Sequence, residues 1–187
     1  VDYRNTIISD MLEEEIPDSA YEDKEHMLEV LDAILNKSQQ QLNIPKGVGK
    51  SYDAILTVKS IPQAQAYYNL LKSIMAGNER VKVSERVKRH LPDFPKFTIT
   101  YSVSENEEES IGYQDYMKQV MEDYNQEFGT HFRLADLRGF NTDVNNRLAR
   151  KQDKYLYRNE QLDLVIVVDR LLTGFDAPCL STLFIDR

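Results

Sequence analysis

The chain has 187 residues, of which 41% are hydrophobic and 29% charged, a composition typical of a soluble globular protein with one or two domains. It contains no apolar run of the about 20 residues that span a membrane and no signal peptide at its start, so we expect a cytoplasmic protein without membrane contact. The net charge of −8 is uneven, because residues 1–36 carry −9 and the rest carry +1. Any contact with nucleic acid must therefore come from local basic segments.

Two acidic amphipathic helices are predicted at the start, over residues 2–15 and 21–41, the second capped by Asp18 or Ser19. The second helix places its apolar side chains at helical spacing, at Met27, Leu28, Leu31, Ile34 and Leu35. We expect residues 1–45 to form a helical lead-in to the main domain. A protein-docking surface is the alternative role.

Residues 47–51, G-V-G-K-S, resemble the end of a phosphate-binding P-loop. However, Ile44 stands where the first glycine should be, and a helix precedes the segment while a strand follows it. A P-loop has the reverse context, because its phosphate sits at the start of a helix. We interpret the segment as a connector into a sheet.

The middle of the chain alternates between strand and helix patterns. Strands are predicted over 53–59 and 96–103, and helices over 63–75, 111–128 and 140–151, the last with Asn141 or Thr142 as its cap. The segment 105–109 is predicted to be an acidic loop.

Two basic segments stand out against the acidic average. The first, residues 78–92, is interpreted either as a solvated connector or as a phosphate contact. The second precedes the last pair of predicted strands. The cations of the first are Arg80, Lys82, Arg86, Lys88 and Arg89; those of the second are Arg147, Arg150, Lys151, Lys154 and Arg158.

The last 26 residues contain two apolar runs, 164–168 and 180–185, which are predicted to be buried parallel strands. A turn between them carries Gly174, Asp176 and Pro178. Asp176 therefore falls beyond the carboxyl end of a strand, where α/β sheets bind ligands. The whole pattern predicts an α/β fold with a parallel sheet, flanked by helices and joined by right-handed crossovers.

The run V-D-R-L-L-T-G-F-D-A-P, which begins at Val168, resembles motif V of the R (restriction and motor) subunits of type I restriction-modification enzymes. Those subunits are superfamily 2 helicase-type DNA translocases. The string Y-D-A-I-L-T-V-K-S-I-P-Q-A-Q-A-Y-Y, which begins at Tyr52, resembles motif IV of the same family. The two motifs occur in the right order, and the resemblance covers roughly residues 50–187.

The resemblance implies that residues 46–187 form part of the second RecA-like lobe of an ATP-driven motor that pumps duplex DNA before cleavage. A P-loop in its proper context and the arginine-bearing motif VI are both missing, so the fragment alone is expected to be inactive and to contain no catalytic residue. ATP and Mg²⁺ would be bound mostly by the rest of the protein. The implied partners are double-stranded DNA and the modification and specificity subunits of the complex.

The resemblance also suggests roles for five residues. Gly174 and Asp176 match the motif V positions beside the ATP ribose, where they would couple the bound nucleotide to DNA binding. The usual phosphate-contacting Thr of motif V is Val168 here, so Thr173 is the nearest candidate for a DNA-backbone contact. Two residues at strand ends, Ser60 and Ser102, are further candidates for phosphate contact, with helix capping as their alternative role.

Two other functions remain open. The first is a non-enzymatic α/β module that docks a protein partner through its acidic helices. The second is a small nucleotide-binding enzyme that uses G-V-G-K-S, and it predicts direct ATP binding by this chain. We expect no metal site, because the three histidines are scattered, and no disulfide, because Cys179 is the single cysteine.

Overall fold

A computed structural model describes residues 23–102, 108–150, 152–168 and 177–186. Its centre is a sheet of four parallel strands in the order β2-β3-β1-β4. The strands are β1 (Asp53–Val58), β2 (Phe97–Thr100), β3 (Leu164–Val168) and β4 (Leu180–Asp186). The predicted α/β class with a parallel sheet is confirmed, and the sheet is compatible with part of a RecA-like lobe.

The two central strands are the apolar runs of the sequence. Strand β1 is buried at every position, and β3 at every position except Val168. Strand β4 is an edge strand, and its side chains alternate between half-buried and exposed. The prediction that 180–185 is a parallel strand is confirmed, but the prediction that it is buried is wrong, since Leu183 and Ile185 are exposed.

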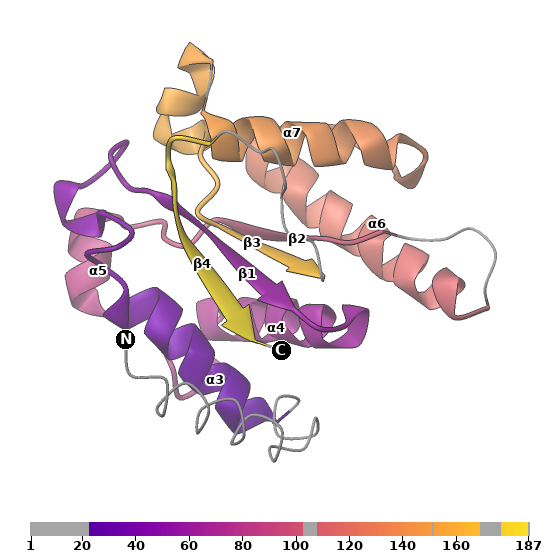
Figure 1. The fold of residues 1–187 in the computed structure, drawn as a ribbon, viewed down its shortest axis with the longest axis horizontal. Coiled ribbons are helices and arrows are strands. Elements are labelled where there is room, and N and C mark those ends of the chain that lie inside the picture. Colours follow the sequence, from indigo (N-terminus) through magenta and orange to yellow (C-terminus); the bar gives the residue numbers. More distant parts are fainter. Residues whose placement is uncertain (1–22, 103–107, 151, 169–176, 187) are drawn as a thin grey trace, which may run out of the picture.

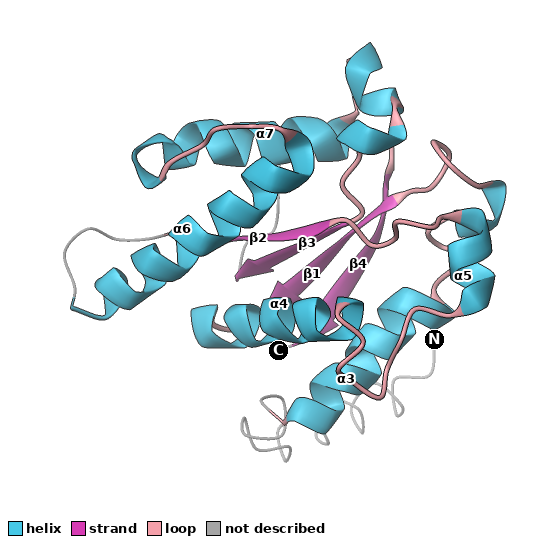
Figure 2. Ribbon diagram, turned by 180° about the vertical axis from the view of Figure 1, so that it is seen from behind, coloured by secondary structure: helices cyan, strands magenta, loops and turns pink. Residues whose placement is uncertain are grey.

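Helices cover both faces of the sheet (Figures 1 and 2). One face carries α4 (Ile61–Met75) and α3 (Lys24–Asp32), which continues as a π-helix over Ala33–Lys37. On the other face lies α7 (Leu137–Ala149), while α6 (Glu108–Phe128) packs against the edge strand β2. The short helix α5 is Glu85–His90, and 3₁₀ turns cover Ile44–Lys46, Leu134–Asp136, Asp153–Leu156 and Arg158–Glu160.

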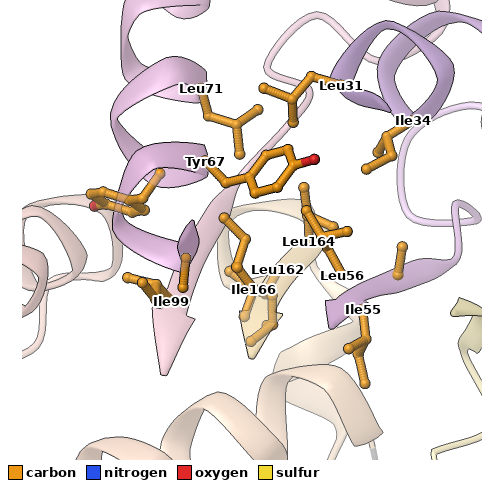
Figure 3. Packing of buried hydrophobic residues seen from close by; sticks show 14 of the residues in the cluster. Leu31, Ile34, Ile55, Leu56, Tyr67, Leu71, Ile99, Leu162, Leu164 and Ile166 are labelled. Atoms are coloured by element: carbon orange, nitrogen blue, oxygen red, sulfur yellow. The ribbon is translucent and has the colours of Figure 1, made fainter. Parts of the chain in front are cut away.

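The hydrophobic core joins the N-terminal helix to the sheet. Figure 3 shows Tyr67 of α4 beside Leu31 and Ile34 of the α3 segment, and next to Leu56 and Leu164 of the sheet. All five side chains are 1% exposed or less. Helix α3 therefore packs as part of the same core as the α/β sheet.

Several predicted boundaries shift because polar side chains fix the helix ends. Asp23, rather than Asp18 or Ser19, caps α3, by accepting a hydrogen bond from the amide of Glu25. The amide of Gly139 donates to Asp136, which caps α7 in place of Asn141 or Thr142. The 78–92 segment, interpreted as a solvated connector or a phosphate contact, contains α5, and the predicted acidic loop 105–109 overlaps the first turn of α6.

The assignment of the α7 cap predicts a modest loss of stability in one variant. Asp136→Ala removes the acceptor for the Gly139 amide and is expected to lower the free energy of unfolding by about 1 kcal/mol. Urea unfolding measures the difference. Thr142→Ala is the matched control, because that exposed hydroxyl donates only to the carbonyl of Arg138 within its own helix. An equal loss in both variants would contradict the assignment.

Candidate functional site

The carboxyl ends of the four parallel strands meet at one edge of the sheet, which carries the two candidate residues that the structure describes. Ser60 follows β1 by two residues, and Ser102 follows β2 by two residues. Strand β3 lies between β1 and β2 and ends at Val168. The other three candidates, Thr173, Gly174 and Asp176, belong to the segment that follows β3 in the chain, and they lie outside the described residues.

Ser60 is the N-cap of α4. Its hydroxyl oxygen accepts a hydrogen bond from the amide of Gln63 at 3.2 Å, and the helix then starts with Ile61 and Pro62. The capping prediction is thus confirmed. The capping bond occupies the oxygen as an acceptor and leaves the hydroxyl proton available to a phosphate oxygen. The positive end of the helix dipole at the same place favours an anion.

Ser102 is exposed and makes no hydrogen bond to another described residue. Two strand spacings separate the ends of β1 and β2, which amounts to about 10 Å. The structure therefore places Ser60 and Ser102 on one edge without bringing them into contact. Residue 102 does not cap a helix, because α6 begins at Glu108.

A residue that the sequence analysis did not single out, Asp186, lies at the same edge. It ends β4, pairs with Val58 of β1 in the sheet register, and is 4% exposed. Its carboxylate accepts hydrogen bonds from Tyr67 and Gln63 and contacts His26. The available signal was a carboxylate that directly follows an apolar strand, as in the case of Asp176.

The arginines of the second basic segment lie near the opposite, amino-terminal edge, where they are buried in ion pairs. Arg150 bonds to Asp53 and to the carbonyl of Ser51. Arg158 bonds to Asp163 and Asp93, with nitrogen–oxygen distances of 2.6 to 2.8 Å. These cations neutralise buried carboxylates beside the first residues of β1 and β3, so they are not available to DNA phosphates.

Arg147 belongs to the same group of buried cations. It is 2% exposed, it binds Asp143 and Glu160 at 2.8 Å, and its guanidinium lies 3.9 Å from the ring centroid of Phe128. Its role is to fix α7 to the segment before β3 and to the aromatic end of α6. A cation held in this way stabilises the fold and is not presented to a ligand.

The first basic segment also lies away from the carboxyl edge. Helix α5 packs against the 3₁₀ turn Ile44–Lys46, at the left of Figure 1, where the strands begin. Its side chains Arg86, Lys88 and Arg89 are exposed. Lys88 pairs with Glu85, and Arg89 donates to the Glu85 carbonyl. These exposed cations can contact a phosphate, but not together with Ser60 and Ser102.

The P-loop-like segment has the context that the sequence predicted. A 3₁₀ turn precedes it, and β1 follows two residues after Ser51, which is 2% exposed. Gly47 and Gly49 have φ of 82° and 79°, a conformation that favours glycine and shapes the connector. Since no helix begins at the segment, it lacks the amide cradle that binds a nucleotide phosphate.

Within the described ranges, no three acidic, histidine or cysteine side chains converge as a metal site would require. In that part of the chain, no helix combines the length and the apolar character needed to cross a lipid bilayer.

The fold and the site define an α/β domain whose parallel sheet presents serine hydroxyls and a buried carboxylate at its carboxyl edge. Residues 50–187 match the family of type I restriction enzyme subunit R domain 3, and the chain belongs to that family. The match begins three residues before β1 and includes all four strands.

Curated relatives agree with the family. The chain is 28% identical over 144 residues to the type I restriction enzyme SsaAORF53P endonuclease subunit of Staphylococcus saprophyticus. It is 27% identical over 146 residues to the SauCOLORF180P endonuclease subunit of Staphylococcus aureus. Each alignment covers 74% of this chain and 14% of the relative, so the chain matches only a small part of those proteins.

Proposed function

We propose that residues 46–187 are part of the second RecA-like lobe of a type I restriction R subunit, an ATP-dependent motor that translocates duplex DNA before cleavage. The observation that carries the proposal is the pairing of the two motif strands. Motifs IV and V are about 110 residues apart in the sequence, yet their strands β1 and β3 are neighbours, with Val58 opposite Val168. Both motifs thus leave the sheet at the same edge, where α/β proteins bind ligands.

Each candidate residue has a proposed role at this edge. Gly174 and Asp176 approach the ATP ribose, and Thr173, Ser60 and Ser102 donate hydrogen bonds to DNA phosphates. Backbone contacts of this kind do not depend on base sequence and weaken with salt. ATP, Mg²⁺ and most of their ligands belong to the longer R subunit, which would act in the cytoplasm with modification and specificity subunits. Residues 1–45 would lead into the lobe.

ATP hydrolysis, measured with and without duplex DNA, tests the proposal on this chain and on the longer R subunit. We expect DNA-stimulated hydrolysis by the longer protein only. Asp176→Ala in that protein is expected to lower the rate at least about tenfold, because a contact in the nucleotide site is lost. Asp153→Ala, which changes an exposed acid in a 3₁₀ turn, is the control and should leave the rate unchanged.

Other results would point elsewhere. Hydrolysis by the 187-residue chain alone would favour a nucleotide site at G-V-G-K-S. If neither protein hydrolyses ATP in the presence of DNA, the interaction module becomes the better explanation.

A further inference from the structure

Asp186 connects three elements of the fold through one buried carboxylate. Its Oδ2 accepts hydrogen bonds from the Tyr67 hydroxyl at 2.6 Å and from Gln63 Nε2 at 2.9 Å, and both donors belong to α4. Its Oδ1 lies 2.7 Å from Nε2 of His26 on α3. The terminal residue of β4 is thus held by the two helices that cover one face of the sheet.

The surroundings of this carboxylate replace the water that burial removes with hydrogen-bond partners. Tyr67 keeps its proton, because its burial and the adjacent Asp186 raise the pKa of the phenol. Two donors and the contact with His26 satisfy the carboxylate oxygens that burial takes from water. His26, with a side chain 37% exposed, is the contact that reaches towards solvent.

Gln63 extends the connection to the turn between β1 and α4. The side-chain oxygen of Gln63 accepts a hydrogen bond from the amide of Lys59 at 3.0 Å, while its backbone amide donates to Ser60. One side chain therefore bonds to Asp186 through its nitrogen and to the turn through its oxygen. A continuous path of hydrogen bonds leads from His26 through Asp186 and Gln63 to the turn that holds Ser60.

From this geometry we infer that Asp186 is a positioning residue, which makes the placement of the Ser60 turn depend on helix α3. The inference rests on the proposed function, in which Ser60 contacts the DNA backbone. Helix α3 precedes the lobe in the chain. A displacement of α3 would be transmitted through His26 to the Ser60 turn and would change the affinity for DNA. Asp186 itself does not contact DNA or nucleotide in this role.

The first test measures ATP hydrolysis by the longer R subunit as the duplex DNA concentration is varied. His26→Leu removes the contact to Asp186 and is expected to raise the half-saturating DNA concentration about fivefold, the factor that corresponds to one hydrogen bond. The rate at saturating DNA should stay within about twofold. His26→Gln, whose amide restores a donor, should recover most of the DNA affinity.

A matched control lies on the same helix. Lys24 of α3 is bonded to Glu79 at 3.0 Å, but its contact does not lead to Asp186. Lys24→Ala should therefore leave the half-saturating DNA concentration unchanged. A purely structural role of His26 would reduce the amount of active protein, and so the maximal rate, without changing that concentration.

A second measurement does not depend on catalysis. Amide hydrogen exchange of the same longer protein, without DNA or ATP, should show faster exchange of the Lys59 amide in His26→Leu but not in Lys24→Ala. If exchange rises only within α3, or if DNA affinity falls equally in both variants, the inference is overturned. If the unaltered protein lacks DNA-stimulated hydrolysis, the proposed function fails, and unchanged Lys59 exchange would then reject the coupling as well.

Discussion

Replacing Arg150 by alanine is expected to lower the free energy of unfolding by about 3–5 kcal/mol, because the change leaves an unpaired charge in the core. The guanidinium bonds to Asp53, a side chain that is fully buried at the amino end of β1, and to the Ser51 carbonyl. Arg150 is also the left-handed C-cap of α7, with φ of 49°. Alanine carries the same Cβ as arginine, so the backbone strain is equal in both proteins and the difference reports the side chain.

The pH dependence of this loss has a definite sign. Burial raises the pKa of Asp53 well above its usual range, while Arg150 opposes that shift. Without Arg150, the folded-state pKa of Asp53 rises further above the unfolded-state value. The variant should therefore be least destabilised at low pH, where Asp53 binds a proton, and should lose stability as the pH rises through the folded-state pKa.

Urea unfolding of both proteins at about pH 5 and about pH 8 measures the loss and its direction. Lys88→Ala is the control, since its exposed pair with Glu85 contributes at most about 0.5 kcal/mol. The double variant Arg150→Met with Asp53→Leu removes both charges and should recover much of the lost stability. A loss of less than about 1 kcal/mol in Arg150→Ala would mean that the buried pair is dispensable.

Strands were easier to predict from the sequence than helix ends. The runs that form β1 and β3 are mostly apolar and rich in β-branched residues, so their boundaries were predicted to within one residue. Helix α5 was missed because Val87 is the single buried residue in six. The start of α7 was misplaced because the L-R-G sequence after Asp136 shows no apolar residues at helical spacing. The helix start is instead fixed by one hydrogen bond, from the Gly139 amide to the Asp136 side chain.

The candidate site was predicted in part, by the rule that parallel strands end at one edge. The order of the strands was not predictable, because a crossover does not fix which earlier strand β3 joins. The role of the second basic segment could not be decided from the sequence for a related reason. Arg150 pairs with Asp53, which lies 97 residues away in the chain. Asp186 was overlooked because its three partners come from helices distant in sequence.

Raising the pH above about 10 is expected to unfold the protein steeply, because tyrosines whose pKa is raised by burial must lose their protons. Burial raises the pKa of Tyr67, Tyr68 and Tyr124, and the neighbouring carboxylates of Asp186, Asp123 and Asp143 raise it further. All three side chains are at most 4% exposed. In the unfolded chain, the same phenols ionise near their ordinary value of about 10.

The sign follows from the raised pKa of the folded state. The stabilising effect of the protonated phenols is fully present below about pH 10 and is lost as the pH rises from there towards the folded-state pKa. Each tyrosine that stays protonated only in the folded state lowers the free energy of unfolding by about 1.4 kcal/mol per pH unit. Tyr67, Tyr68 and Tyr124 together give a slope of about 4 kcal/mol per pH unit, and Tyr101 and Tyr116, whose pKa is also raised by burial, add to it.

Urea unfolding at about pH 9, 10 and 11, with tyrosinate absorbance recorded on the folded protein, measures this slope. Tyr68→Phe should reduce the slope by about 1.4 kcal/mol per pH unit, because one shielded phenol is removed while Asp123 keeps its ion pair with Lys72. Tyr157→Phe is the control, since Tyr157 is 68% exposed and its replacement should leave the slope unchanged. If all the tyrosines of the folded protein ionise together near about pH 10, the phenols are not shielded as their burial requires.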